Sequence, residues 1–443
     1  MMTETAADAV RTLGARSKKL IWTEIPDRVR DRTLLVIFDT LGVMMAGAAT
    51  PEVQALADRH PETGSAPLAG LERWGSALDS CWVNGFAVCS LELDEGNKYA
   101  RGHPAAHVIP AALACGDHDG KSWLGAVLAG YEVAARFGRA TRLHRGVHPH
   151  GTWGATGAAT TAAKLSDLDA DGVAAAIDAA TGLSLAPHFE SAFRGHPVRN
   201  LWVGAANSAG LAAARLAYAG TGRVDGTAAN TYGDLIGTFD PAPLMVPFEE
   251  RFEIMGGYFK RHAACAYTHS AADAALRLFE QDQRIKVEEV NSVSVETYQI
   301  ASTLNRLEWP SRLAAMFSVP FVVAVTLLEG AFGPTATDEH HRSDPEVRDL
   351  AERVAVTATD EFERRLPERR GARVSVEMRD GSRRSAEVEQ PVGDAAGQPF
   401  GWDQVRTKLT DLIGSERVAD LERTLRNLES ESIAPLLLAV TRS

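Results

Sequence analysis

A helix-length run that is apolar on nearly every face constrains the fold of this chain most strongly. Large apolar side chains occur throughout residues 31–48 and leave no polar stripe that could face water. A helix of this kind is stable only when other helices surround it, so the run predicts a central helix of a bundle. Asp39 lies in its middle, and because a buried carboxylate needs hydrogen-bonding partners, we interpret Asp39 as structural. Further apolar, Ala-rich helices are expected at residues 78–93, 107–116, 122–142 and 153–165.

The character of the sequence changes near residue 245. Prolines and paired glycines interrupt the helical pattern, and residues 287–300 are rich in Val, Thr and Tyr. Residues 372–378 and 383–388 flank Asp380-Gly381, which is a strong signal for a β-hairpin. Helices are expected among these strands at residues 271–281, 313–329 and 344–355. The middle of the chain is therefore predicted to be an α+β domain, and helices with one apolar face return from Trp402 onward.

Composition argues against several classes of function. The 443 residues carry a net charge of −12, and nucleic-acid binding needs a basic face instead. The four cysteines show no C-x-x-C spacing, which is typical of buried thiols in a reduced compartment. The N-terminus has no signal-peptide pattern, and the apolar run at residues 34–48 is short for a membrane span and contains Asp39. We therefore expect a soluble cytoplasmic protein with no nucleic-acid or membrane partner.

Ionisable side chains are concentrated in three loops that separate apolar segments. In chain order these loops are residues 92–104 with Asp94, Arg101 and His103, residues 144–152 with His144, His148 and His150, and residues 188–200 with Arg194, His196 and Arg199; Lys260 to His262 add a fourth cationic spot. Each side chain alone could cap a helix or be a solvated surface charge. Together they predict a pocket for a polycarboxylate, with Arg or Lys binding carboxylates and His transferring protons.

Metal and cofactor motifs give little support to other chemistries. His148 and His150 with Asp94 could in principle bind a metal ion. However, Pro104 and Gly146 interrupt the other His pairs, and there is no H-E-x-x-H or paired C-x-x-C motif. The sequence also has no Walker A loop, no G-x-G-x-x-G after a strand and no G-x-S-x-G. These motifs therefore favour neither a metal ion nor a nucleotide cofactor.

Eight short motifs in one order resemble a known family. They are residues 38–42 (Phe-Asp-Thr-Leu-Gly), 83–85, 102–111 (Gly-His-Pro-Ala-Ala-His-Val-Ile-Pro-Ala), 130–136, 147–154 (Val-His-Pro-His-Gly-Thr-Trp-Gly), 260–269, 317–321 and 391–394. The chain thereby resembles the MmgE/PrpD family, which includes 2-methylcitrate dehydratase, cis-aconitate decarboxylase and iminodisuccinate epimerase. The resemblance implies a mainly α protein. A large all-helical domain built from both chain ends (1–245 plus 400–443) would carry an inserted smaller α+β lid domain (246–399). It also implies an active site between the domains, a homodimer and no cofactor.

The resemblance also assigns roles to individual residues. It implies catalytic roles for Asp94, His103, His148 and Lys260, and substrate binding by Asn97, Arg101, His150, Thr152 and Arg199. Two positions depart from the family pattern. Arg199 stands where many members have a lysine, so it can bind a carboxylate but cannot readily transfer a proton. Gly96 and Asn97 stand where many members have other residues after a pair of acidic ones, and this difference is expected to affect which substrate fits.

These assignments predict an acid–base mechanism. Lys260 and Arg199 are expected to hold substrate carboxylates, and His103, oriented by Asp94, to be the main acid–base group, with His148 as a second. The predicted function is a cofactor-independent lyase for a small di- or tricarboxylate, first of all a dehydratase of a 2-methylcitrate-like substrate. A cis-aconitate-type decarboxylase and an iminodisuccinate-type epimerase are alternatives within the family. A non-catalytic polycarboxylate-binding protein is the alternative of another class.

Overall fold

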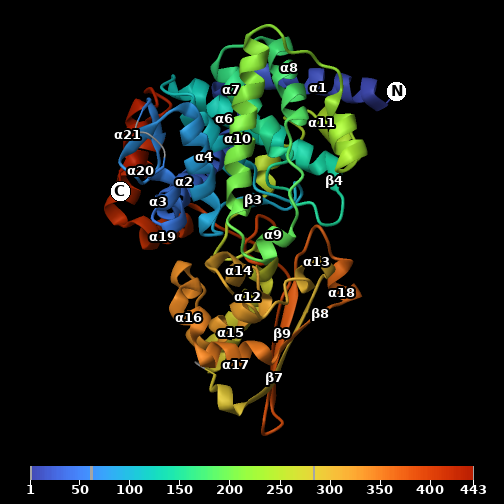
Figure 1. The fold of residues 1–443 in the computed structure, drawn as a ribbon, viewed down its shortest axis with the longest axis vertical. Coiled ribbons are helices and arrows are strands. Elements are labelled where there is room, and N and C mark those ends of the chain that lie inside the picture. The colour runs from blue at the N-terminus through green and yellow to red at the C-terminus, as the bar shows by residue number, and fades with distance from the viewer. Residues whose placement is uncertain (1, 60–62, 283–284, 443) are drawn as a thin grey trace.

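The apolar run of the sequence is helix α2 (Asp27–Ala48), and it lies among other helices as predicted (Figure 1). The computed structural model describes residues 2–59, 63–282 and 285–442. Helix α2 packs against α4 (Ala77–Ser90) and α19 (Trp402–Ile413), so segments from both ends of the chain meet there. Asp39 is fully buried, and Lys408 of α19 donates to it at 2.7 Å. The partner that a buried carboxylate needs is therefore a lysine from the far end of the sequence.

The first of the two large hydrophobic cores is helical and takes in both chain ends; a third cluster is small and consists of Tyr298, Ala301 and Phe362. The buried apolar residues of the first core run from Ala6 to Ala263 and again from Val405 to Val440. The other helices around it are α1 (Met2–Lys19), α3 (Pro51–Ala57), α5 (Pro104–Ala114), α6 (Gly120–Ala140), α7 (Gly154–Leu165), α8 (Ala170–Gly182), α10 (Val198–Tyr218), α11 (Ala242–Met245), α20 (Ser415–Asn427) and α21 (Ala434–Thr441). Two small β-pairs, β1 (Ala66–Leu68) with β2 (Arg73–Gly75) and β4 (Thr141–Leu143) with β5 (Gly237–Phe239), lie at its edges. Figure 1 shows the C-terminal helices beside α2 and α3.

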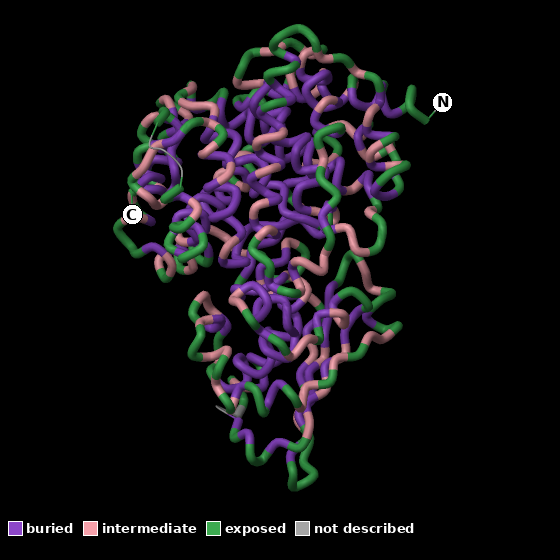
Figure 2. Tube along the Cα trace, viewed as in Figure 1, coloured by how far each residue is buried: buried purple, intermediate pink, exposed green. Residues whose placement is uncertain are grey.

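The second core combines helices with a four-stranded sheet. The sheet order is β10 (Arg383–Val388), β9 (Ala372–Met378), β7 (Val290–Thr297) and β8 (Val354–Ala358), with β7 and β8 parallel and the other pairs antiparallel. Helix α12 (His269–Asp282) packs on β9 and β10, and α15 (Val319–Glu329) packs on α12 and β8. The β9–β10 hairpin predicted from Asp380-Gly381 is confirmed, because Arg383 pairs with Glu377 and Gly381 has a positive φ of 87°. Figure 2 shows a buried interior in both parts of the molecule.

Two helices predicted in this region are interrupted. Residues 313–329 form α14 (Arg312–Met316) and α15, because the Ser318 hydroxyl accepts from the Phe321 N–H and starts a new helix, with Pro320 in its first turn. Residues 344–355 form α17 (Pro345–Glu352), after which the chain enters β8. Val354 and Val356 are β-branched and gain ladder hydrogen bonds beside β7, so tertiary pairing overrides the helical pattern.

The remaining short elements connect the larger ones. They are α9 (Glu190–Phe193), α13 (Gln299–Ser302), α16 (Glu339–Ser343), α18 (Asp360–Glu363), β3 (Gly96–Asn97), β6 (Gly257–Tyr258), β11 (Val392–Gly393) and β12 (Gln398–Pro399). In the described part of the chain, no single helix is both long and apolar enough to cross a membrane. Helices α2 and α3 meet that test only as a pair, and they are bent by 82° at their junction.

Candidate active site

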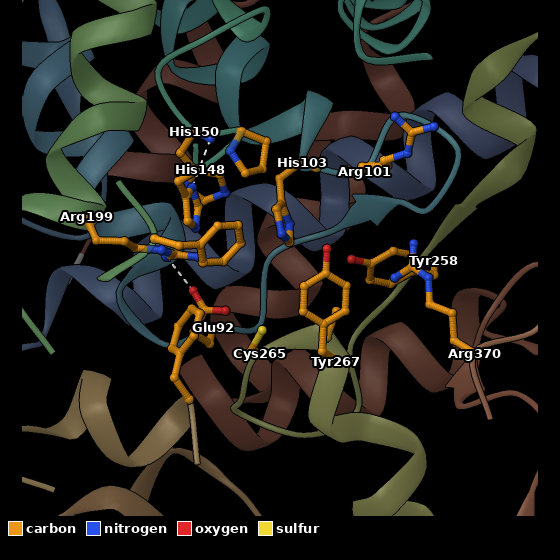
Figure 3. Close-up of a pocket in the computed structure, with 15 residues that line it drawn as sticks. Glu92, Arg101, His103, His148, His150, Arg199, Tyr258, Cys265, Tyr267 and Arg370 are labelled. Carbon is orange, nitrogen blue, oxygen red and sulfur yellow. Dashed lines mark hydrogen bonds and ion pairs between the residues drawn. The ribbon is translucent and has the colours of Figure 1, made fainter. Parts of the chain in front are cut away.

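A narrow pocket lies where the two cores meet. The loops of the first core contribute His103, His148, His150 and Arg199 to its wall, and the opposite wall includes Tyr267 and Arg370 (Figure 3). The space that water can occupy inside it is about 40 Å³. That is room for a few water molecules and less than a tricarboxylate needs.

The loop between α4 and α5 carries the first polar cluster and is fixed on both sides. Strand β3 within it pairs antiparallel with β6, so Gly96 lies opposite Tyr258. A Cβ atom at Gly96 would lie 2.4 Å from the Tyr258 hydroxyl oxygen, so only glycine allows this close approach. Lys98 reaches across to Asp394, where its Nζ is 2.9 Å from the carboxylate, and both side chains are buried. The loop thus connects the two parts of the molecule.

His103 is held by two acceptors on the same ring nitrogen. Its Nδ1 lies 2.9 Å from Asp94 Oδ2 and 2.8 Å from the Glu95 carbonyl oxygen. A ring nitrogen that faces two acceptors carries the hydrogen. In the neutral ring, Nε2 therefore has no hydrogen and can accept a proton. Burial alone would raise the pKa of Asp94, but the charges of His103 and Lys260 lower it well below its usual range. Asp94 is therefore ionised and can stabilise a protonated His103.

Behind His103 lies a buried ion network that shares the carboxylate of Glu92. Lys260 Nζ lies 3.1 Å from Glu92 Oε2 and 3.2 Å from Asp94 Oδ1. Arg199 forms an ion pair with Glu92 and also donates to Asn200 Oδ1 at 3.0 Å. Burial would lower the pKa of Lys260, but Asp94 and Glu92 raise it above its ordinary value. Lys260 is thus a charged ammonium that is committed to protein carboxylates.

The second polar cluster contributes two neutral histidines. The Nδ1 atom of His148 accepts from the backbone N–H of His150 at 3.0 Å, so its Nε2 carries the hydrogen. Burial and the charge of Arg199 lower the pKa of both imidazoles well below the ordinary value. Among the described residues, neither ring nitrogen of His150 has a hydrogen-bonding partner, although the side chain is buried. Both rings border the pocket and can hydrogen-bond to a ligand.

Five of the residues predicted for the site border the pocket, and four lie behind it. Arg101, His103, His148, His150 and Arg199 form part of its wall. Asp94 and Lys260 lie one layer away, in contact with His103 and Glu92. The Asn97 amide donates to the Glu253 carbonyl oxygen at 2.8 Å, and the Thr152 hydroxyl donates to Pro149 at 2.6 Å. In this structure Asn97 and Thr152 therefore hold loops in place.

Several wall residues were missed in the sequence. Glu92 was one of three carboxylates in the first loop, and the ion network that distinguishes it depends on tertiary contacts. Tyr258 and Cys265 lie in the segment around Lys260, where no local pattern marks them. Burial raises the pKa of the Cys265 thiol to about 12, so it is a neutral group and not an activated nucleophile. Arg370 lies in a charged stretch that resembles an exposed surface, and its position in the pocket could not be predicted.

Three side chains lie close enough together to share a metal ion. One donor atom each from Asp94, His103 and His150 come within 4.8 Å of one another. The ammonium of Lys260 is 3.2 Å from Asp94 and would repel a cation there. The same Asp94 and His103 also already contact each other, so the arrangement fits a proton-transfer pair better than a metal centre.

The fold and the pocket define a mainly helical protein with a narrow, polar pocket between two hydrophobic cores. Residues 13–241 match the MmgE/PrpD N-terminal domain and residues 262–431 match the MmgE/PrpD C-terminal domain. The chain therefore belongs to the MmgE/PrpD family. It is 26% identical to the cis-aconitate decarboxylase of Aspergillus terreus (strain NIH 2624 / FGSC A1156), with 98% of each chain covered. It is also 22% identical to the cis-aconitate decarboxylase-like protein oryM of Aspergillus oryzae, with 94% of each chain covered.

Proposed function

We propose that this protein is a cofactor-independent lyase that acts on a small polycarboxylate, with His103 as its acid–base group. The observation that carries the proposal is the Asp94–His103 pair, which leaves the Nε2 atom of His103 free at a pocket bordered by arginines. A pocket of this kind suits reactions in which a carbanion develops beside a carboxylate, because cations stabilise the developing negative charge where water is excluded. The resemblance to cis-aconitate decarboxylases over nearly the whole chain supports the substrate class.

In the proposed mechanism, each buried group has a distinct part. Arg199 binds a substrate carboxylate, and His103 takes or delivers the proton at the reacting carbon. Asp94 stabilises the protonated imidazole, and the ammonium of Lys260 contacts both Asp94 and Glu92 and lowers the pKa of Asp94. His148 donates its Nε2–H to an oxygen of the substrate. This role differs from the proton donor expected from the sequence, since a neutral imidazole is a weak acid.

Decarboxylation is the first reaction to test. In that reaction the bond to the departing carboxylate breaks, CO₂ leaves and the electron pair stays on carbon. His103 enters this step protonated on Nε2 by a solvent proton, with Asp94 stabilising the charged ring, and delivers that proton to the carbon. Dehydration of a 2-methylcitrate-like substrate would also need a strong acid to protonate the departing hydroxide. The lowered pKa of His148 does not favour that role. Dehydration remains the second candidate because the family includes such enzymes.

We infer that the two large hydrophobic cores belong to two domains, predicted from the sequence as a helical one (1–245 plus 400–443) and an α+β lid (246–399). The cores place the change later in the chain, between Ala263 and Ala264, so residues 246–263 pack with the helical domain, while Ala192 packs in the core of the lid. Because a pocket of about 40 Å³ is too small for a tricarboxylate, we infer that the lid moves when substrate enters. The predicted homodimer is part of this proposal, and the mass of the protein in solution tests it.

A panel assay tests the function. The purified protein is incubated with di- and tricarboxylates that include cis-aconitate, and CO₂ release and products are followed by NMR. Release of CO₂ with one new product supports decarboxylation, and loss of water supports dehydration. If no member of the panel changes in any way, the proposed lyase activity is contradicted and a binding protein is favoured.

A further inference from the structure

Arg370 differs from the other buried cations around the pocket because it has no carboxylate partner. Its side chain borders the pocket and the residue is only 8% exposed. Lys98, Arg199 and Lys260 each pair with at least one carboxylate. Among the residues that the structure describes, no carboxylate forms an ion pair with Arg370. A buried charge is costly unless it is paired, so an anion that enters the pocket would find an unsatisfied cation there.

Phenol groups surround Arg370 in place of carboxylates. The guanidinium carbon lies 5.2 Å from the centre of the Tyr258 ring, over its face. Burial raises the pKa of Tyr258 to about 12, and it also raises the pKa of Tyr267. Both phenols are therefore neutral and can donate a hydrogen bond to an anion. Figure 3 shows the hydroxyl groups of Tyr258 and Tyr267 turned toward the centre of the pocket, below His103.

The pocket is electrically asymmetric. At one end, the charge of Arg199 is balanced by Glu92. At the other end, no carboxylate of the described residues balances Arg370. Arg101 borders this end, but its guanidinium points away from the pocket centre in Figure 3, and its Nη1 donates to the Thr141 carbonyl oxygen at 3.1 Å. His103 lies between the two ends in Figure 3. A substrate with two carboxylates could therefore place its reacting carbon at His103 with one carboxylate on each side.

We propose that Arg370, with the hydroxyl groups of Tyr258 and Tyr267, forms a second carboxylate subsite that selects substrates carrying at least two carboxylates. The inference rests on the proposed function and goes beyond it by naming how the far carboxylate is recognised. A guanidinium binds a carboxylate through two parallel N–H groups, and a phenol can donate to the same oxygens. Arg199 and Arg370 would thus set the span between the two carboxylates of the substrate.

Binding of cis-aconitate, measured by calorimetry in protein that also carries His103→Gln to suppress turnover, tests the subsite. Arg370→Gln is expected to weaken binding by about 10- to 150-fold, the range for a lost hydrogen bond to a charged group. Arg369→Gln is the matched control. Arg369 precedes Arg370 in the sequence, but it is exposed and pairs with Glu389 at 2.8 Å on the surface. That variant is expected to bind like the His103→Gln parent protein.

A second pair of variants covers the case in which Arg370→Gln does not fold. Tyr267→Phe removes only one hydroxyl group from the pocket and is expected to weaken binding by roughly 10-fold. Tyr298→Phe removes a buried hydroxyl near Arg370 that is not part of the pocket wall, and it is expected to leave binding unchanged. Unchanged affinity in folded Arg370→Gln, or in Tyr267→Phe when Arg370→Gln does not fold, would overturn the subsite. Failure of the wild type to bind or convert any polycarboxylate would instead overturn the proposed function itself.

Discussion

At the scale of single residues, the negative charge that Asp94 places beside His103 is the feature on which the chemistry depends. Asp94→Asn keeps the shape of the side chain but removes this charge. The Glu95 carbonyl oxygen still accepts from His103 Nδ1, but the protonated imidazole that delivers a proton to carbon loses the carboxylate that stabilises it. We expect turnover to fall by roughly 10²- to 10⁴-fold.

Steady-state kinetics with the best substrate of the panel checks this expectation. Asp273→Asn is the control. Asp273 also pairs with a histidine, since its Oδ1 lies 3.0 Å from His262 Nε2, but neither residue is part of the pocket wall. Equal turnover in Asp94→Asn and wild type would show that the charge of Asp94 does not act on the acid–base group.

Glu95 predicts a distinct pH dependence of stability. Burial raises its pKa from 4.5 to about 8, despite a hydrogen bond from Tyr131 at 2.6 Å. The folded state therefore binds the proton more tightly than the unfolded state, and this contribution to stability is present below about pH 4.5 and lost as pH rises through 8. The loss amounts to at most about 1.4 kcal/mol per pH unit.

Glu95→Gln replaces the protonated carboxyl with a neutral group of the same shape. Thermal unfolding curves between pH 5 and pH 9 should show the wild type losing more stability than Glu95→Gln as the pH rises. Parallel pH profiles for the two proteins would mean that Glu95 is ionised in the folded state.

Much of the site could be predicted at the residue scale, but the partners of its members could not. His103, His148 and Arg199 have recognisable local surroundings, such as a His-Pro turn before or after an apolar helix. The positions of Glu92 and Arg370 at the pocket depend on contacts with residues far away in the sequence. Lys260 was expected at the substrate, and its contacts with Asp94 and Glu92 became visible only in three dimensions.

At the scale of elements, the β3–β6 contact positions the wall of the pocket. Gly96→Ala would place a Cβ atom 2.4 Å from the Tyr258 hydroxyl oxygen, so Tyr258 or the loop must shift. We expect a higher KM for a polycarboxylate with a smaller change in kcat, because Tyr258 belongs to the binding wall. Gly125→Ala is the control, since a Cβ there would meet its nearest atoms at 3.7 Å or more. A KM that Gly96→Ala leaves unchanged would contradict this role of Tyr258.

Periodicity and turn chemistry predicted the elements unequally. The position of α2 follows from its apolar faces and that of the β9–β10 hairpin from Asp-Gly, because both signals are local. The break before α15 depends on the Ser318 cap and on Pro320, which are local signals that the continuous apolar pattern obscured. The strand β8 depends on pairing with β7, and this tertiary effect overrides a helical pattern and is not visible in a single sequence.

At the scale of the whole molecule, the buried pair of Lys98 and Asp394 joins the two parts of the chain. The atoms lie 2.9 Å apart, and the two side chains are 1% and 3% exposed. Lys98→Ala leaves a buried carboxylate without its cation, which costs about 3–5 kcal/mol. Denaturant unfolding measures this loss. Lys286→Ala is the control, because its pair with Glu289 is exposed and such pairs contribute about 0–1 kcal/mol. Equal losses in the two variants would mean that the pair does not hold the parts together.

The central claim is that His103 transfers a solvent proton to carbon. Deuterium incorporation tests this claim most directly. Three proteins are compared: the wild type, His103→Gln and the control His144→Ala, which replaces an exposed histidine. Each is incubated with cis-aconitate in heavy water that contains a metal chelator, and NMR follows deuterium in substrate and product. The account predicts deuterium at a carbon beside a carboxylate with the wild type and His144→Ala, and a rate lower by roughly 10²- to 10⁴-fold with His103→Gln. Equal incorporation by His103→Gln and the wild type would contradict it.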